Sequence, residues 1–80
     1  MKKLLYFGGS FCSACKALWL KVEREAPAMG YDVEYLDIDE DDGALFADEY
    51  KVRSLPTIIV IENGKETKRA VGSTAWEEVK

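Results

Sequence analysis

The stretch KLLYFGGSFCSACK, residues 3–16, decides the fold of this chain. It opens with the apolar run of residues 3–7, which suits a buried strand, and a Gly-Gly-Ser loop then ends that strand. Two cysteines, Cys12 and Cys15, follow at the start of a helical pattern. A thiolate near a helix start meets unpaired backbone N–H groups and the positive end of the helix dipole, which favour the charged, nucleophilic form. The stretch therefore predicts a strand, a loop and a dithiol redox site at the beginning of a helix.

The first helix is predicted to run from the cysteine pair through Met29. Apolar residues at helical spacing form the face expected to pack on the core: Ala14, Ala17, Leu18, Val22, Ala26 and Met29. Trp19 and Leu20 broaden this face. Pro27 lacks a backbone donor, so we expect the helix to kink or end near it, and Gly30 is typical of a helix stop.

An acidic run separates the second predicted strand from the second predicted helix. Residues 31–38 alternate between apolar and acidic and then turn apolar, as a strand does. Residues 39–42 lack the spacing of a calcium loop, so we expect a solvated loop rather than a metal site. Its carboxylates are expected to cap the next helix and to complement its dipole. That short amphipathic helix covers residues 45–50 and ends near Lys51.

Two strands and a short helix complete the chain. The β-branched run of residues 57–61 predicts a buried strand, the Asn-Gly pair at 63–64 predicts a hairpin turn, and residues 65–71 return as a more polar strand. Ser73 is the expected N-cap of the last helix. Its inward-facing residues are expected to be Trp76 and Val79.

The predicted order of elements is βαβαββα, which belongs to the α/β class. A right-handed crossover makes the first two strands parallel, and the hairpin adds an antiparallel pair to the same sheet. We therefore expect a four-stranded mixed sheet flanked by three helices, in a single domain of residues 1–80. Functional groups of open α/β sheets collect beyond the carboxyl ends of the strands, where the loop of residues 8–12 would lie.

Charge and hydropathy exclude several classes of partner. The net charge of −4 and the pI near 4.8 leave no basic surface for nucleic acid or anionic membranes. No apolar run approaches the roughly 20 residues that cross a bilayer. The sequence MKKLL at the start is similar to the opening of a secretion signal, but its apolar stretch stops at Gly8 without a cleavage site. The expected compartment is a reducing cytoplasm.

These features together resemble the thioredoxin family. The resemblance is carried by the cysteine pair with Lys16 after it, by SLPT at residues 54–57, by the Asn-Gly turn and by Val-Gly at residues 71–72. It spans nearly the whole chain. The chain is closer in size to the glutaredoxins and lacks the extra first strand and helix of ordinary thioredoxins, so it resembles a minimal, glutaredoxin-sized thioredoxin.

The resemblance implies a protein-disulfide reductase that works through a Cys12–Cys15 disulfide without metal or prosthetic group. Helix residues three apart have Cβ atoms about 5–6 Å apart, whereas a disulfide needs about 3.5–4.5 Å. Cys12 is therefore expected just outside the helix, as the nucleophile that attacks a substrate disulfide. Cys15, one turn inside, is expected to resolve the mixed disulfide.

The resemblance also implies a substrate groove. The peptide bond between Leu55 and Pro56 is expected to be cis and to bring that backbone beside the cysteines. Phe11 and Gly72 are expected to border the same groove. The residues expected to meet the substrate are Phe11, Ser13, Ala14, Leu55, Pro56 and Gly72.

The chain departs from the family pattern at two places. Tyr6 and Tyr35 stand where thioredoxins usually carry a buried Asp and a Lys. A phenol is a weak base at neutral pH, so Cys15 is expected to lose its proton to water or to the departing thiolate, with slower resolution and retained function. Ser13 and Ala14 replace the usual Gly-Pro, so the family's redox potential does not transfer.

Several alternatives stay open at this point. The alternative enzymatic function is a glutathione-dependent, glutaredoxin-like reductase. The alternative that is not an enzyme is a non-catalytic thioredoxin-like binding module. A permanent staple is weakly supported, because so short a loop contributes only about 2 kcal/mol. A zinc site would require a dimer, because one chain offers two thiols and zinc usually takes four ligands.

The chain is expected to be a monomer. Its expected partners are disulfide-containing proteins and an electron donor such as thioredoxin reductase or glutathione. Trp19 and Trp76 are expected to be packing groups.

Overall fold

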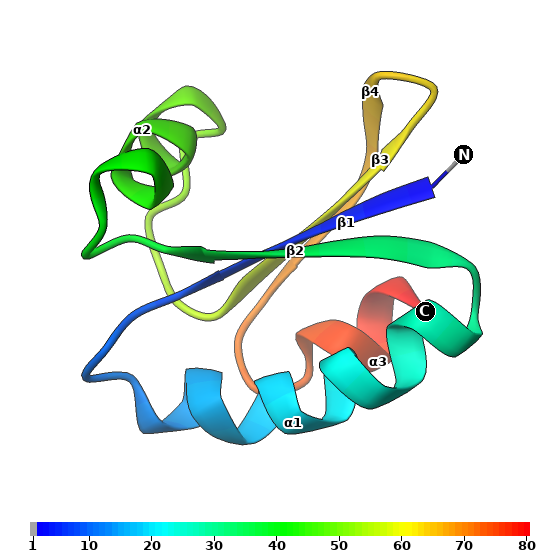
Figure 1. The fold of residues 1–80 in the computed structure, drawn as a ribbon, viewed down its shortest axis with the longest axis horizontal. Coiled ribbons are helices and arrows are strands. Elements are labelled where there is room, and N and C mark those ends of the chain that lie inside the picture. The colour runs from blue at the N-terminus through cyan, green and yellow to red at the C-terminus, as the bar shows by residue number, and fades with distance from the viewer. Residues whose placement is uncertain (1) are drawn as a thin grey trace.

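The computed structural model of the chain describes residues 2–80. It contains the expected order of four strands and three helices (Figure 1). The elements are β1 Lys2–Gly8, α1 Ser13–Ala28, β2 Tyr31–Asp37, α2 Asp41–Glu49, β3 Thr57–Glu62, β4 Lys65–Val71 and α3 Ala75–Val79. No helix within this described part of the chain is long and apolar enough to span a membrane.

The four strands form one mixed sheet in the order β2-β1-β3-β4. β1 runs parallel to β2 and antiparallel to β3, and β4 returns antiparallel to β3. The turn between β3 and β4 has positive φ at Asn63 and Gly64, the backbone that this residue pair favours. β1 has neighbours on both sides and buries residues 4–8, which explains why its sequence is apolar without alternation. The predicted mixed sheet is confirmed.

Helices cover both faces of the sheet (Figure 1). α2 lies on one face, and α1 and α3 lie together on the other. The core is divided accordingly: Leu4 and Tyr6 of β1 face α1 and α3, while Leu5 and Phe7 pack with residues on the α2 side. Trp76 is fully buried and Trp19 packs against the same cluster, so the prediction that both are packing groups is confirmed.

The buried face of α1 differs in part from the predicted one. Its buried residues are Cys15, Leu18, Val22 and Ala26. Ala14 and Ala17 are exposed and Met29 is 46 % exposed, so their predicted core positions are wrong. Leu20, at 64 % exposure, does not broaden the face. Pro27 lies inside the helix, whose last turn continues to Ala28.

The acidic run enters α2 instead of remaining in a loop. α2 begins at Asp41, four residues earlier than predicted, and Asp41 and Asp42 occupy its first turn. This position complements the helix dipole as expected. The capping part of the prediction is wrong, because the N-cap residue Glu40 makes no side-chain capping bond. Gly43 lets the helix approach the end of β2 closely, since an added Cβ would collide with the backbone of Asp37.

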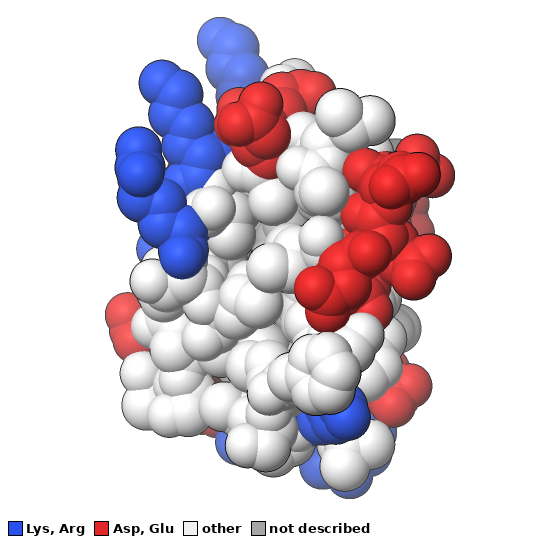
Figure 2. Space-filling view, turned by 90° about the vertical axis from the view of Figure 1, so that its left-hand side faces the viewer, with Lys and Arg blue, Asp and Glu red and all other residues white. Residues whose placement is uncertain are grey.

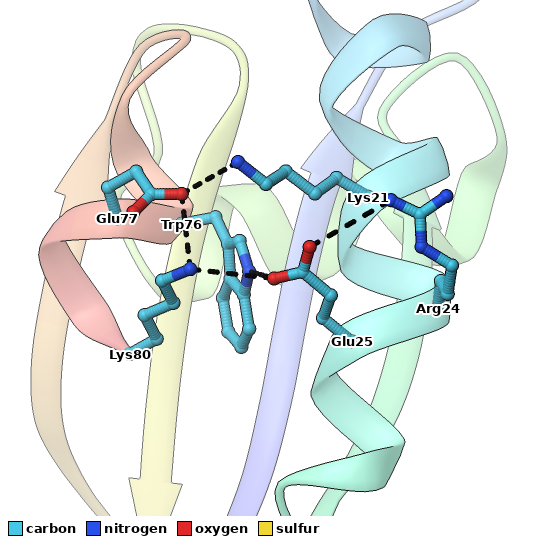
Figure 3. A network of polar contacts seen from close by, with 6 residues as sticks. All are labelled: Lys21, Arg24, Glu25, Trp76, Glu77 and Lys80. Atoms are coloured by element: carbon cyan, nitrogen blue, oxygen red, sulfur yellow. Dashed lines mark hydrogen bonds and ion pairs between the residues drawn. The ribbon is translucent and has the colours of Figure 1, made fainter.

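α3 begins one residue later than predicted. Thr74, not Ser73, is the N-cap residue, and Gly72, with φ +101°, turns the chain two residues before it. The short helix is fastened to α1 by buried Trp76, whose indole N–H donates to Glu25 Oε1 at 2.8 Å. Ion pairs surround this bond (Figure 3). They are Lys80 with Glu25 and Glu77, Lys21 with Glu77, and Arg24 with Glu25.

Candidate active site

Strand register gathers four chain segments at one end of the sheet. Phe7 pairs with Thr57, and Thr57 pairs with Val71. The residues that continue these strands therefore leave the sheet side by side, and Gly72 N–H donates to the carbonyl of Pro56 at 2.8 Å. β2 ends at the same edge, where Gly8 is in register with Asp37. The loop that follows β1 carries the cysteine pair.

Cys12 and Cys15 are joined by a disulfide, with their Cα atoms 5.2 Å apart. Cys12 is the N-cap residue of α1 and has extended backbone angles, φ −106° and ψ 99°. The expectation that Cys12 lies just outside the helix is confirmed. Its Sγ accepts a hydrogen bond from the backbone N–H of Cys15 at 3.1 Å, and Cys15 is fully buried.

This arrangement favours thiol-disulfide exchange. A sulfur at an N-cap faces backbone N–H groups and the positive end of the helix dipole, so the charged thiolate is stabilised there. The partner sulfur sits one turn inside the helix and is already within bonding reach. Within residues 2–80, no three His, Cys, Asp or Glu side chains are grouped as a metal site requires.

The residues predicted to meet the substrate lie on the cysteine loop, in the first turn of α1 and beside the adjoining ends of β3 and β4. The Leu55–Pro56 peptide bond is cis, as the resemblance implies. Leu55 packs against the cysteine loop, because a Cβ added to Gly9 would lie 3.2 Å from Leu55 Cδ1. Phe11 is fully exposed at the loop tip. Ser13 and Ala14 are exposed in the first turn of α1, and Gly72 is bonded to Pro56.

Known proteins resemble this chain in sequence and in fold. The family model described as Thioredoxin matches residues 1–80. The chain belongs to the thioredoxin family. Thioredoxin from Mycoplasma genitalium is 36 % identical over 66 residues, which are 82 % of this chain and 64 % of that protein. Thioredoxin from Chlamydia trachomatis is 36 % identical over 69 residues, which are 86 % of this chain and 67 % of that protein. This thioredoxin-family chain thus spans about two thirds of the length of these relatives.

A solved structure matches closely in shape. Thioredoxin 1 from the thermophilic eubacterium Thermosipho africanus superposes with a TM-score of 0.85 at 30 % identity, covering 96 % of this chain and 84 % of that one. The predicted thioredoxin-like fold is therefore confirmed.

Tyr6 makes a contact in this thioredoxin-family chain that was not expected from the sequence. Its hydroxyl donates to the backbone carbonyl of Cys15 at 2.6 Å, inside the core. Burial raises the pKa of Tyr6 well above its ordinary value, with a smaller contribution from Tyr35. The phenol is therefore neutral at physiological pH and fastens the redox helix to the central strand. Burial of Tyr6 was predictable from the apolar run of β1, but the partner of its hydroxyl was not.

Tyr35 lies beside Tyr6 on the neighbouring strand. The two rings stack with centroids 5.6 Å apart, and Trp19 of α1 meets Tyr35 edge-on at 4.9 Å. Burial raises the pKa of Tyr35, and the negative charges of Asp37 and Asp39 raise it further. An aromatic cluster of three rings therefore underlies the first turns of α1.

Acidic residues hold the cysteine loop to the end of β2. Ser10 N–H donates to Asp39 Oδ2 at 2.9 Å, and Asp39 N–H donates to Asp37 Oδ1 at 2.8 Å. The side of the molecule that carries this loop has a broad uncharged area between acidic side chains at one margin and basic side chains at the other (Figure 2). Such an uncharged area suits contact with a polypeptide better than contact with a highly charged ligand.

Proposed function

We propose that this chain reduces disulfide bonds in proteins by thiol-disulfide exchange. The observation that carries the proposal is the placement of the cysteine pair, with Cys12 at the N-cap of α1 and Cys15 buried one turn inside, joined in a disulfide. Membership of the thioredoxin family supports the same chemistry.

The reaction runs in two exchange steps. The Cys12 thiolate attacks one sulfur of a substrate disulfide, which forms a mixed disulfide and releases the other substrate sulfur as a thiolate. Cys15 then loses its proton and attacks Cys12 Sγ, so the second substrate thiolate departs and the Cys12–Cys15 disulfide is closed. Two electrons pass from the cysteine pair to the substrate, and an outside dithiol or flavoprotein donor restores the reduced pair.

The substrate segment is proposed to lie across the uncharged area next to the cysteines. Leu55 and Pro56 would offer their backbone to an extended chain, and exposed Phe11 would cover it from the loop tip. Ala14 lines a shallow apolar groove together with Ala17 and Ser73, which could accept a substrate side chain. Gly72 is tied to Pro56 and would border the same segment.

The electron donor is proposed to be a thioredoxin reductase, with the chain acting as a monomer in a reducing compartment such as the cytoplasm. Two cysteines three residues apart serve catalysis in such a compartment rather than a secreted disulfide framework. Glutathione is the competing donor. Assays with each donor side by side distinguish a thioredoxin from a glutaredoxin-like reductase.

Insulin reduction tests the proposal. Reduced wild-type chain should cleave insulin disulfides catalytically in the presence of dithiothreitol, and Cys12→Ser should abolish the catalysis. Cys15→Ser should instead accumulate a mixed disulfide with its substrate, because resolution is lost. Equal rates for wild type and Cys12→Ser would refute the enzymatic assignment and favour a binding module, and zinc in purified dimers would point the same way.

A further inference from the structure

The proton of Cys15 has to leave a closed site. Cys15 has no exposed surface, so bulk water does not reach its side chain directly. The resolution step nevertheless requires its thiolate, because the thiolate and not the thiol is the nucleophile. A group that contacts both Cys15 and solvent would supply the missing path.

Tyr6 does not fit this role, although it touches the same residue. Its hydroxyl is buried and donates its proton to the carbonyl oxygen of Cys15 at 2.6 Å. The hydroxyl proton is therefore committed to a backbone acceptor. Tyr6 has no exposed surface from which to pass a proton to water.

The missing side chain of Gly8 leaves a gap that the Tyr35 hydroxyl and Cys15 both border. A Cβ added to Gly8 would lie 2.7 Å from Tyr35 Oη and 3.3 Å from Cys15 Cβ. The hydroxyl and the cysteine side chain thus flank the same point. Gly8 does not belong to the glycines with positive φ, so space and not backbone conformation explains the glycine here. Any larger residue would separate Tyr35 from Cys15.

The Tyr35 hydroxyl also meets solvent. Among residues 2–80 it has no hydrogen-bond partner, and every side-chain polar atom sealed from solvent in that part of the chain does have one. The hydroxyl is therefore accessible to solvent. The titratable groups that face it are Tyr6, Cys15, Asp37 and Asp39. The negative charges of the two carboxylates oppose a tyrosinate, so the hydroxyl can release its proton only as it receives another.

We propose that the Tyr35 hydroxyl carries the Cys15 proton to solvent during the resolution step; this rests on the proposed function. Tyr35 accepts the thiol proton while its own hydroxyl proton passes to water, so Tyr35 is neutral before and after the step. The Cys15 thiolate attacks Cys12 Sγ, the bond from Cys12 to the substrate sulfur breaks, and the substrate thiolate leaves with the electron pair. Water returns one proton to that thiolate, which closes the proton balance.

Stopped-flow reaction with the aromatic disulfide DTNB separates the two exchange steps. Reduced chain releases one coloured thiolate when Cys12 attacks and a second when Cys15 resolves the mixed disulfide. The leaving thiolate needs no proton, so the second phase reports the ionisation of Cys15. Tyr35→Phe keeps the stacked ring and should slow the second phase at neutral pH by at least about tenfold, with the first phase within about twofold of wild type. The deficit should shrink as pH rises, because Cys15 is then ionised before the attack and the relay is no longer needed.

Two matched variants distinguish a proton path from a packing effect. Tyr6→Phe also removes one hydroxyl from the same aromatic cluster, and its second phase should keep the wild-type pH profile. Gly8→Ala should reproduce the Tyr35→Phe profile, because the methyl group separates the hydroxyl from Cys15. A wild-type pH profile in Tyr35→Phe, or equal slowing of both phases, would overturn the proposal.

A measurement on wild type alone covers the case in which the variants do not fold. The second phase should show a larger solvent deuterium isotope effect than the first phase, since only the second moves protons through the hydroxyl. Equal isotope effects overturn the relay. If wild type fails to release two thiolates per chain, the proposed function fails instead, so the two failures are distinguishable.

Discussion

Cys12 Sγ lies where α1 presents its free backbone N–H groups, and it already accepts one hydrogen bond, from Cys15 N–H at 3.1 Å. In the reduced chain the same donors would stabilise a thiolate. We therefore predict that the rate of Cys12 alkylation by iodoacetamide rises with a midpoint well below the ordinary thiol pKa of about 8.5. Cys15→Ser keeps Cys12 and should keep the low midpoint. A midpoint near the ordinary thiol value would contradict an activated nucleophile.

Tyr6 should make stability depend on alkaline pH. Burial raises its pKa in the folded chain, so the unfolded chain loses the phenol proton first as pH rises through about 10. The unfolded state then binds fewer protons than the folded state, and the free energy of unfolding falls as pH increases. Tyr6→Phe should cost about 1 kcal/mol at neutral pH through the lost hydrogen bond and should flatten the alkaline decline.

Urea unfolding followed by circular dichroism, repeated from neutral pH to about pH 11, checks this expectation. Tyr31→Phe is the control, because Tyr31 packs against Trp76 away from the cysteines. Parallel alkaline declines in wild type and Tyr6→Phe would show that burial of this phenol is not the cause.

At the scale of elements, α3 is too short to be stable alone and depends on its attachment to α1 (Figure 3). Glu25→Ala leaves the buried indole N–H of Trp76 without its acceptor and should lower the free energy of unfolding by about 1–3 kcal/mol. Glu25→Gln keeps an acceptor oxygen and should cost less. Arg24→Ala removes only an exposed ion pair at 3.9 Å and should cost under about 0.5 kcal/mol.

The attachment of α3 to α1 should also make the free energy of unfolding depend on acidic pH. The hydrogen bond from Trp76, followed by the charge of Lys80, lowers the pKa of Glu25. Its contribution to stability is therefore present above the ordinary glutamate pKa of about 4.3 and is lost as pH falls below it. Denaturant titrations between neutral and acidic pH should show this loss in wild type and not in Glu25→Gln.

The order and type of the elements were predictable from sequence, but the ends of several helices were not. The apolar run of β1 predicted a buried strand and the Asn-Gly turn predicted an antiparallel hairpin, and both are present. The start of α2 was misjudged because Asp41 and Asp42 resemble a loop yet suit the first turn of a helix. In α1, alanines at positions 14 and 17 carry too little apolar surface to fix which face is buried.

In the candidate site, too, features that depend on neighbouring residues were predictable and features that depend on distant residues were not. The cysteine pair and its place at the helix start were predictable, because both depend on neighbouring residues. The bond from Tyr6 to Cys15 and the gap at Gly8 join residues of β1 to α1 through the core. Such contacts depend on how the helix is set on the sheet, which a single sequence does not specify.

For the whole molecule, we expect the disulfide to serve the redox reaction and to contribute little to the stability of the fold. It closes a very short loop, so loop-closure entropy alone predicts a loss of at most about 2 kcal/mol on reduction. The sheet and both core clusters involve other residues. Reduced chain in dithiothreitol should therefore unfold cooperatively in urea, with a midpoint modestly below that of the oxidised chain. Unfolding on reduction alone would identify a structural staple, and the Cys12→Ser, Cys15→Ser double variant provides a permanently reduced reference.

The central position of β1 determines how its amide hydrogens exchange with solvent. β1 is bonded on both edges and shielded by helices on both faces, so its amide hydrogens should exchange with deuterated solvent only when the entire chain opens. The cysteine loop begins where this strand stops. Redox cycling therefore acts at the tip of the slowest-exchanging segment, and deuterium uptake along β1 should be the same before and after many turnovers.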